Sequence, residues 1–185
     1  GNSIRKVMEQ KDRYKGIVGV VADIIKTQKQ YETAIETALG GTIQNIVTDN
    51  EETAKGLIAF LKQNKFGRAT FLPLSAISGR DIRVDSSLTR ENGAVGFANQ
   101  LVECDSEFTE LARYLLGRIL VVDNIDNALA IARRHNHSLR IVTLEGDMLS
   151  PGGSMSGGAF KNSSNLLGRR REIEKLEASV SVKEA

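Results

Sequence analysis

Apolar residues recur along this chain with two periods, and each period predicts a different element of structure. Residues 18–25 place apolar side chains at alternate positions, which is typical of a buried strand. Residues 30–39 place them three and four positions apart, as on one face of a helix, and Gly40-Gly41 predicts the end of that helix. The same reasoning predicts strands over 42–48 and 69–72, and a helix over 51–64 with Asp49 or Asn50 as its N-cap and with Ala54, Leu57, Ile58 and Leu61 facing inward.

The second half of the chain repeats this order of elements. Strands that alternate with helices are typical of an α/β body, so we predict an α/β fold with mixed sheets. The elements concerned are extended segments within 95–102, a helix over 107–116, a strand over 118–122, a helix over 124–135 and a strand over 139–144.

The two halves also share residues at a fixed distance. Gly16-Ile17-Val18-Gly19 returns 77 positions later as Gly93-Ala94-Val95-Gly96. After a small gap, Val47-Thr48-Asp49-Asn50 corresponds to Val121-Val122-Asp123-Asn124. A period this long does not fit a solenoid, so we predict two pseudo-equivalent lobes built from one folding unit. A duplicated unit between two heptad-like ends is seldom an enzyme and is more typical of a connecting module.

Both ends of the chain carry apolar residues at heptad-like spacing. Each end holds about two heptads, fewer than a coiled coil needs to be recognised from sequence. Two interpretations stay open: amphipathic helices that pack on the body, or arms that continue outside this fragment and pair antiparallel. The residues concerned are Ile4, Val7, Lys11 and Tyr14 at one end and Ile173, Leu176, Val180 and Lys183 at the other.

Bulk composition excludes several classes of function. The formal net charge is +2, so any contact with nucleic acid must come from local clusters of basic residues. The single cysteine, Cys104, cannot form an internal disulfide. No apolar run resembles a signal peptide or approaches the roughly 20 residues of a membrane span. We therefore expect a reduced, cytoplasmic setting and no membrane contact.

No group of residues predicts catalysis or metal binding. His135 and His137 are too close in sequence to share one helical face, and they have no obvious set of Cys or carboxylate partners. Cys104 lies between Glu103 and Asp105, whose charges raise the pKa of a thiol and argue against a nucleophile. We expect no enzyme activity, no cofactor, no metal and no small-molecule substrate.

A glycine-rich segment, residues 145–160, lies between the last predicted strand and the last predicted helix. Glycine costs backbone entropy, so its repeated use implies positive φ angles or the close approach of another backbone. An exposed strand edge beside such residues is a natural place for a second chain to pair. A flexible loop and a phosphate cradle are the alternatives, although the segment lacks the Lys-Ser/Thr ending of a P-loop. The glycines are Gly146, Gly152, Gly153, Gly157 and Gly158.

Several segments of the chain have distinctive sequences. The glycine spacing Gly-x6-Gly-x3-Gly-Gly falls on Gly146, Gly153, Gly157 and Gly158. It accompanies the repeated Gly-x-Val-Gly and four further segments, residues 34–41, 61–73, 140–147 and 151–158. Together these resemble the hinge domain of bacterial SMC (structural maintenance of chromosomes) proteins, and the resemblance covers about residues 14–165.

The resemblance implies a domain organisation. In that family the hinge lies at the far end of a long antiparallel coiled coil whose opposite end carries an ATPase head. ATP binding would then belong to the full-length protein only, and this piece performs no chemistry. The implied parts are a coiled-coil stub over 1–14, a first lobe over 15–75, a linker over 76–92, a second lobe over 93–165 and a second stub over 166–185.

The resemblance also implies a homodimer. Two hinges of the family associate head to tail through their lobes, which gives a ring with two contacts. Two modest contacts closed into a ring hold better than either alone, yet either can open, which suits a DNA-entry gate in chromosome condensation and segregation at the nucleoid. The implied interface residues are Gly146, Gly153, Gly157 and Gly158, with Gly152 beside them.

Hinges of this family bind DNA, most often near the coiled-coil junction, so basic residues there are candidates. With about three to five phosphate contacts, binding is expected to be weak and independent of sequence. A solvated helix end is the ordinary explanation for such clusters. The candidates are Lys62, Lys65, Arg68, Arg169, Arg170 and Arg171.

The alternative from a different class is a small α/β nucleotide- or phosphate-binding domain. It would use the glycine segment over 146–158 as its cradle. A hinge should be dimeric at micromolar concentration and indifferent to ATP or NAD, whereas a cradle should bind such ligands.

Overall fold

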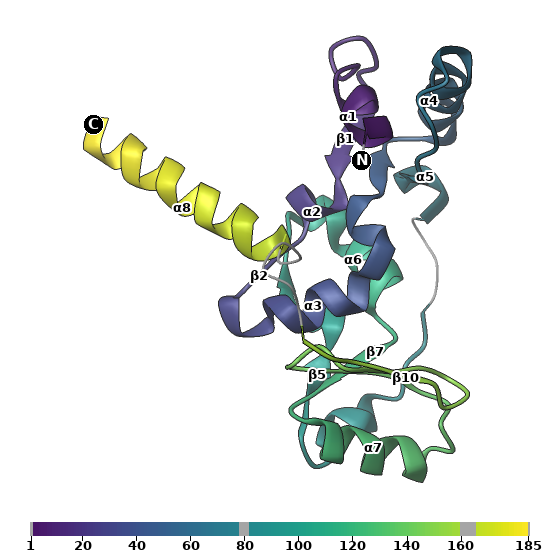
Figure 1. Cartoon of the computed structure of the whole chain (residues 1–185), viewed down its shortest axis with the longest axis vertical. Helices are drawn as coiled ribbons and strands as arrows, with labels where there is room; N and C mark the ends of the chain where they lie inside the picture. Colours follow the sequence, from purple (N-terminus) through teal and green to yellow (C-terminus); the bar gives the residue numbers. More distant parts are fainter. Residues whose placement is uncertain (1, 78–81, 160–165, 185) are drawn as a thin grey trace.

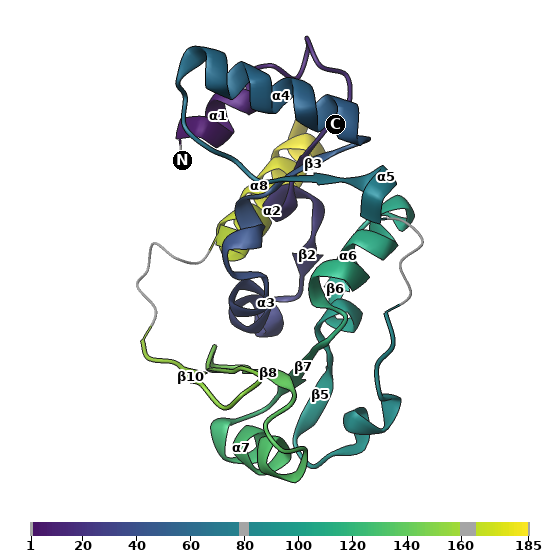
Figure 2. The ribbon, with the colours of Figure 1, turned by 90° about the vertical axis from the view of Figure 1, so that its right-hand side faces the viewer.

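The molecule is elongated, with a sheet toward each end and helices packed between the sheets. The computed structural model describes residues 2–77, 82–159 and 166–184, the last four of these as backbone only. Figures 1 and 2 both show the N-terminal sheet at the top and the C-terminal sheet at the bottom, with one long helix leaving the body between them.

The N-terminal sheet has three strands, in the order β1-β3-β4. Strand β1 (Ile17–Val20) runs antiparallel to β3 (Ile46–Thr48), and β3 runs parallel to β4 (Phe71–Pro73). Helix α4 (Glu51–Asn64) connects the two parallel strands, with the bounds that the sequence predicts. Its N-cap is Asn50, one of the two predicted capping residues, whose side chain accepts a backbone N–H three positions on.

The C-terminal sheet contains the same unit and extends it. Strand β5 (Ala94–Phe97) is antiparallel to β7 (Ile119–Val122), β7 is parallel to β8 (Arg140–Thr143), and α7 (Ile125–Arg134) connects β7 to β8. The full strand order is β10-β9-β8-β7-β5. The additional strands form a hairpin of β9 (Met148–Leu149) and β10 (Met155–Ser156).

The elements between the strands correspond as well. Helix α3 (Glu32–Leu39) in the first half and α6 (Thr109–Leu116) in the second lie 77 positions apart. The other short elements are α1 (Asn2–Met8), α2 (Val21–Ile24), β2 (Lys26–Thr27), η1 (Lys29–Tyr31), η2 (Gly40–Gln44), α5 (Leu74–Ile77), η3 (Ser86–Arg90), η4 (Ala98–Leu101), β6 (Val102–Glu103) and η5 (Ser106–Phe108), and the chain ends in α8 (Leu166–Glu184).

The repeated glycine has the same packing role in both halves. The carbonyl of Gly16 accepts the N–H of Asp49 at 2.9 Å, and a Cβ on Gly16 would lie 2.2 Å from both Asp49 Oδ1 and Thr53 Oγ1. In the second half, the carbonyl of Gly93 accepts the N–H of Asp123 at 2.9 Å, and a Cβ there would lie 2.5 Å from Asp123 Oδ1. The sequence repeat is therefore a repeated tight packing of a strand start against a helix cap.

The two halves are related by an approximate twofold axis. Strands β2 and β6 pair antiparallel, and Lys26 faces Glu103 in that pair. These residues are each other's counterparts, since they are 77 positions apart, and a residue faces its own counterpart only at a twofold axis. The predicted mixed α/β fold with two related halves and terminal helices is thus confirmed.

One apolar core lies between the halves. Ile35 from α3 and Leu111 from α6 belong to a single cluster of buried side chains, together with Val47 from the first sheet and Val121 from the second. Two smaller clusters lie farther out, one under α4 and α1 and one under α7. The halves therefore share their largest core, as parts of one folding unit do.

Each half sends its last helix onto the central helix of the other half. Helix α5, which follows the first sheet, packs against α6, and α8, which follows the second sheet, packs against α3 and α2. Each contributes one buried apolar side chain to the shared core, Ile77 from α5 and Leu167 from α8. This exchange adds to the β2–β6 pairing in joining the halves.

The strand predicted over 18–25 ends early. It stops at Val20, and the chain turns into α2, where Val21 and Ala22 are buried, as is Ile25 just beyond it. One turn of helix buries a continuous apolar run as well as a strand does, so the run alone does not distinguish them.

Other predicted elements shift at their starts. The strand predicted from residue 42 begins at Ile46, because residues 40–44 form a 3-10 helix. The helix predicted from residue 107 begins at Thr109, after another 3-10 turn. Ile58, predicted to face inward on α4, is 41% exposed, because it faces a hollow beside β4 instead of the core.

The two terminal helices do not lie side by side. Helix α1 packs on α4, and its Val7 is fully buried with Leu57 and Leu61. Helix α8 leaves the body in a different direction (Figure 1). Within the described residues, the N-terminal heptad therefore serves packing on the body, and the antiparallel pairing of arms is not seen.

Replacing Gly16 with alanine should lower the free energy of unfolding by about 1–3 kcal/mol, because the new methyl group must displace Asp49 and Thr53 from a packed turn. Gly41→Ala is the matched control, since a Cβ there meets nothing within 4 Å. Urea denaturation of both variants measures the difference. Equal losses of stability in the two variants would contradict the role given to Gly16.

Candidate association edge and basic surfaces

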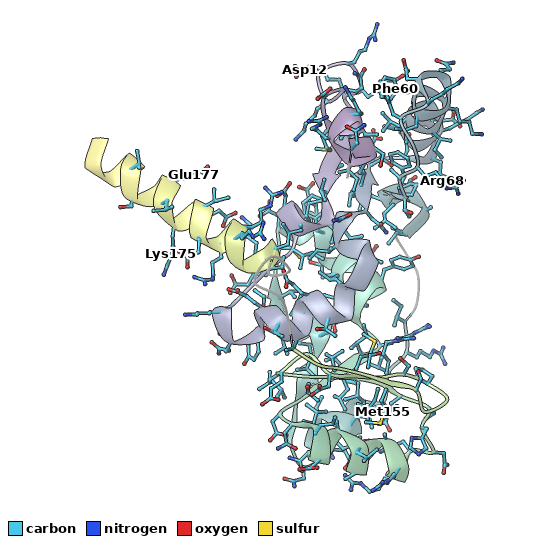
Figure 3. The ribbon with its side chains drawn as sticks, viewed as in Figure 1. Asp12, Phe60, Arg68, Met155, Lys175 and Glu177 are labelled. Atoms are coloured by element: carbon cyan, nitrogen blue, oxygen red, sulfur yellow. The ribbon has the colours of Figure 1, made fainter. Side chains whose placement is uncertain are left out.

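The glycine segment forms the outer edge of the second sheet. Strand β9 pairs with β8, and β10 pairs with β9, so β10 is the last strand. Residues 151–159 are exposed, and Met155, seen on this sheet in Figure 3, is 50% exposed. One side of β10 therefore presents backbone donors and acceptors that no described strand of this chain pairs with.

Three of the five glycines shape the turns before and after β9. Gly146 has a φ of 94° and donates its N–H to Thr143 O at 3.0 Å. Gly152 and Gly153 have φ values of 96° and 107°, and Gly152 donates to His137 O at 2.8 Å while Gly153 donates within the turn. All three amides are used inside the chain, so they do not converge on a free anion site, which argues against the phosphate cradle.

The last two glycines follow β10. A Cβ on Gly157 would lie 2.5 Å from Asp147 Oδ1, so the backbone there lies directly against that carboxylate. Gly158 has a φ of 132° and nothing within 4 Å of its Cβ position. Asp147 is held in turn by Thr143, whose hydroxyl donates to Asp147 Oδ2 at 2.8 Å and accepts the Asp147 N–H at 3.0 Å. The hairpin is thus held to β8 by a buried threonine.

The first group of candidate DNA-binding residues lies at the C-terminal end of α4. Lys62 is in its last turn, Lys65 is its C-cap with a φ of 54°, and Arg68 follows, all three exposed. None of them forms an ion pair with a described residue. Lys6 of α1 lies 5.0 Å from the centre of the Phe66 ring, so the packing of α1 on α4 adds a fourth positive charge to this surface.

The second group lies at the start of α8, where Arg170 and Arg171 form ion pairs within the chain. Arg170 Nε is 3.1 Å from Asp23 Oδ1, and Arg171 forms a close ion pair with Glu32, a residue that is only 3% exposed. The hydrogen bond that Arg171 donates to Glu32 raises the pKa of the Arg171 guanidinium further above its ordinary value. Arg169, the third member, is exposed.

The structure does not bring these two groups together. Figure 3 shows Arg68 on the side of the body that carries α4, whereas α8, with Lys175 and Glu177, leaves toward the other side. Sequence reasoning missed Asp23 and Glu32 as partners of the arginines, because those contacts join residues more than a hundred positions apart. Glu32 carried one signal, a carboxylate placed among the apolar positions of the predicted helix.

The remaining polar groups do not assemble a reaction centre. Among the described residues, no three His, Cys, Asp or Glu side chains are grouped so that they could hold a metal ion. Burial, and then the Asp105 charge, raise the pKa of the Cys104 thiol, which disfavours the reactive thiolate. None of the described helices combines the length and apolarity needed to cross a bilayer.

A hollow of about 690 Å³ lies on the surface of the second half. Its lining includes Phe97 and Leu139 and three arginines, Arg83, Arg118 and Arg140. All three arginines are exposed, so water reaches their charges and these charges do not require a bound anion.

Comparison with known families gives a specific match. The family described as "SMC proteins Flexible Hinge Domain" matches residues 14–132. The chromosome partition protein Smc of Bacillus subtilis is 46% identical over 174 residues, which are 92% of this chain and 15% of that protein. The Smc protein of Clostridium kluyveri is 47% identical over 156 residues, which are 84% of this chain and 13% of that protein.

Solved structures agree with this match. An asymmetric dimer of the Geobacillus stearothermophilus SMC hinge domain superposes with a TM-score of 0.88 at 39% identity, over 100% of this chain and 75% of that one. The Pyrococcus furiosus SMC hinge domain superposes with a TM-score of 0.69 at 33% identity, over 85% of each chain.

Replacing Thr143 with valine should loosen the glycine hairpin selectively. Valine keeps the side-chain shape but removes a hydroxyl that makes two hydrogen bonds, a loss of about 1–3 kcal/mol in a buried site. The amide of Ser150, which bonds to Ser154 O at 2.9 Å across the hairpin, should then exchange with solvent about tenfold faster or more.

Thr48→Val is the matched control for this exchange experiment. Thr48 is also fully buried, and its hydroxyl donates to Asn50 O in the first half, away from the hairpin. If both variants accelerate exchange at Ser150 equally, the bond between Thr143 and Asp147 does not hold the hairpin.

Proposed function

The chain belongs to the flexible hinge domain family of SMC proteins, and we propose from this that it joins two copies of a longer chromosome-partition protein. The chain spans about 15% of the length of the curated relatives it matches, and the ATPase heads are absent from it. The observation that carries the proposal is the likeness to the Geobacillus hinge domain, whose structure is that of a dimer.

The two halves of this chain suggest which edges meet in such a dimer. Strands β4 and β8 are counterparts, because each is the parallel neighbour of the strand that starts the βαβ crossover. The outer edge of β8 is covered by β9, whereas no described strand covers the outer edge of β4. The first sheet lacks a neighbour at the position where the second sheet has gained two strands.

We propose that β10 of one copy lies along β4 of the other. Beside β4 is a hollow of about 490 Å³ whose lining includes Ile58, Ala69 and Phe71. Ile58 is 41% exposed there, and Met155 on β10 is 50% exposed, so each edge presents an apolar side chain for the other to bury. Methionine adapts well to such irregular apolar surfaces. The glycines around β10 allow the second backbone to approach closely.

This pairing closes on itself. If β10 of the first copy meets β4 of the second, a twofold axis places β10 of the second copy on β4 of the first. The result is a ring with two equal contacts, in which the second contact forms at a high effective concentration. One contact can then open while the other keeps the dimer together, as a DNA-entry gate requires.

Replacing Met155 with aspartate should leave a folded monomer at micromolar concentration, because dimer formation would bury an unpaired charge in the apolar hollow. Ile58→Asp, on the opposing surface, should have the same effect. Sedimentation equilibrium gives the molar mass, and circular dichroism gives the fold.

Val84→Asp is the control for these variants, since Val84 is also 41% exposed but lies in the segment between the two halves. Bulky residues at Gly157 and Gly158 should also give a monomer, although Gly157 additionally contacts Asp147. A dimer that survives both Met155→Asp and Ile58→Asp would remove β10 and β4 from the interface.

We also propose that the hinge binds DNA weakly and without sequence preference, as a nucleoid-associated cytoplasmic protein would. The surface around Lys62, Lys65 and Arg68 is the better candidate, because these charges have no described partner, whereas Arg170 and Arg171 are paired with carboxylates. The lysines of this surface present point charges, which suit phosphates and carry no sequence information.

Reversing Lys62 and Lys65 to glutamate should reduce affinity for duplex DNA about tenfold or more at low salt. With three to four phosphate contacts, the log–log salt slope should be about −3 to −4 in the parent protein and should lose about one unit per lysine removed. Fluorescence anisotropy measures both quantities. Lys175→Glu on α8 is the control for each single reversal, because it changes the charge by the same amount. A loss in Lys175→Glu equal to that in Lys62→Glu or Lys65→Glu alone would exclude the α4 surface.

A further inference from the structure

We infer that a polar clasp sets the direction of α8, and that opening this clasp frees the helix while the body stays folded. The clasp consists of Asp23, Lys26, Glu32 and Glu36 on the body and, on α8, the first-turn amides with Arg170, Arg171 and Glu174. In the longer relatives, where the hinge continues into arms, the clasp would set the angle at which this arm leaves the hinge. That consequence rests on the proposed function, whereas the clasp itself does not.

Glu36 of α3 caps the beginning of α8 from another helix. Its Oε1 accepts the backbone N–H of Leu167 at 2.6 Å. First-turn amides have no partner within their own helix, and the positive end of the helix dipole favours a carboxylate there. Burial raises the pKa of Glu36, and the amide hydrogen bonds act against that rise. The contact thus fixes the first turn of α8 on α3.

Glu32 fixes the next turn. It lies one helical turn before Glu36 on α3, so the two carboxylates share one face of that helix. Glu32 is 3% exposed, and its Oε1 accepts a hydrogen bond from Nε of Arg171. A carboxylate this buried requires a cationic partner, so Arg171 is strongly tied to this position.

Two ion pairs at the surface complete the clasp. Arg170 Nε lies 3.1 Å from Asp23 Oδ1, and Lys26 Nζ lies 2.5 Å from Glu174 Oε1. Arg170 and Glu174 lie one turn apart on α8 and carry opposite charges. If the helix slid by one turn, Glu174 would face Asp23, and two negative charges would repel each other. The alternation therefore specifies the register of α8 on the body as well as its attachment.

Apolar packing does not specify the direction of α8 in the same way. Leu167 is buried and Leu166 is partly buried at its first turn. Farther along, Ile173, Leu176 and Val180 are 49%, 65% and 53% exposed, so they do not pack on the body. Figure 1 shows the helix projecting from the body beyond its first turns. Two leucines can hold one end of a helix in place while leaving its angle open.

The clasp belongs to one half of the molecule alone. The positions 77 residues after Glu32 and Glu36 are Thr109 and Arg113, so α6 has no carboxylate at these places. The counterpart of Asp23 is Gln100. The two halves therefore differ at the positions where α8 attaches, and the carboxylates of the clasp have no counterparts 77 residues later.

The test is a distance measurement between two spin labels in the intact chain. Labels go on Lys175→Cys in α8 and Gln63→Cys in α4, which lies outside the hollow beside β4. Cys104→Ser removes the native thiol, and excess unlabelled protein prevents distances between copies. Pulsed electron resonance should give one narrow distance distribution. Asp23→Arg should broaden it about twofold, because it replaces an exposed attraction with a repulsion.

A charge swap separates the clasp from general damage. Adding Arg170→Asp to Asp23→Arg restores an opposite pair and should restore the narrow distribution. The double variant Glu32→Gln/Glu36→Gln should broaden it further, and about 1 M salt, where the Debye length is about 3 Å, should broaden the parent through its two exposed pairs. Glu177→Gln, on α8 outside the clasp, is the control and should change nothing.

Three outcomes would overturn the inference. If the distance distribution stays narrow in Asp23→Arg and in the double variant, Leu166 and Leu167 set the direction of α8. If the swap fails to restore the narrow distribution, the Asp23–Arg170 pair is incidental. If the double variant loses the circular dichroism or the molar mass of the parent, the carboxylates support the body and not the helix direction. Failed dimerisation with an intact clasp would contradict the proposed function alone.

Discussion

The pairing of β2 with β6 across an approximate twofold axis is the contact on which the rest of the structure depends. At this point Lys26 faces its own counterpart, Glu103, and the central helices α3 and α6 enclose one apolar core. Because each half completes the core of the other, neither sheet needs a partner on its inner side. Their outer edges, at the two ends of the molecule, are left for contacts with other chains.

The duplication is not perfect, and its differences coincide with the proposed functional surfaces. The second sheet continues through β9 and β10, whereas the first ends at β4 beside an apolar hollow. Two ends of unlike shape favour an exchange between two copies, since each molecule carries both halves of the contact. The carboxylates of α3 that hold α8 are likewise absent from α6. The two related halves therefore carry different surfaces.

The two basic clusters of the molecule also differ from each other, in whether carboxylates of the chain pair with them. Basic residues near the first sheet, including Lys62 and Lys65, remain unpaired among the described residues, whereas Arg170 and Arg171 are engaged by Asp23 and Glu32. Two clusters that look alike in sequence therefore have different roles open to them. An unpaired surface cluster attracts a polyanion, and a paired cluster fixes geometry.

The sequence by itself determined the repeat, the helix over 51–64 with its Asn50 cap, and the glycine segment, because these depend on residues close together in the chain and on the freedom of glycine at positive φ. Tertiary structure decided that the chain turns at Val21, that Ile58 faces a hollow, that the glycines border an edge strand, and that Arg171 meets Glu32. Each of these depends on which distant segment lies alongside, and local periodicity carries no record of that partner.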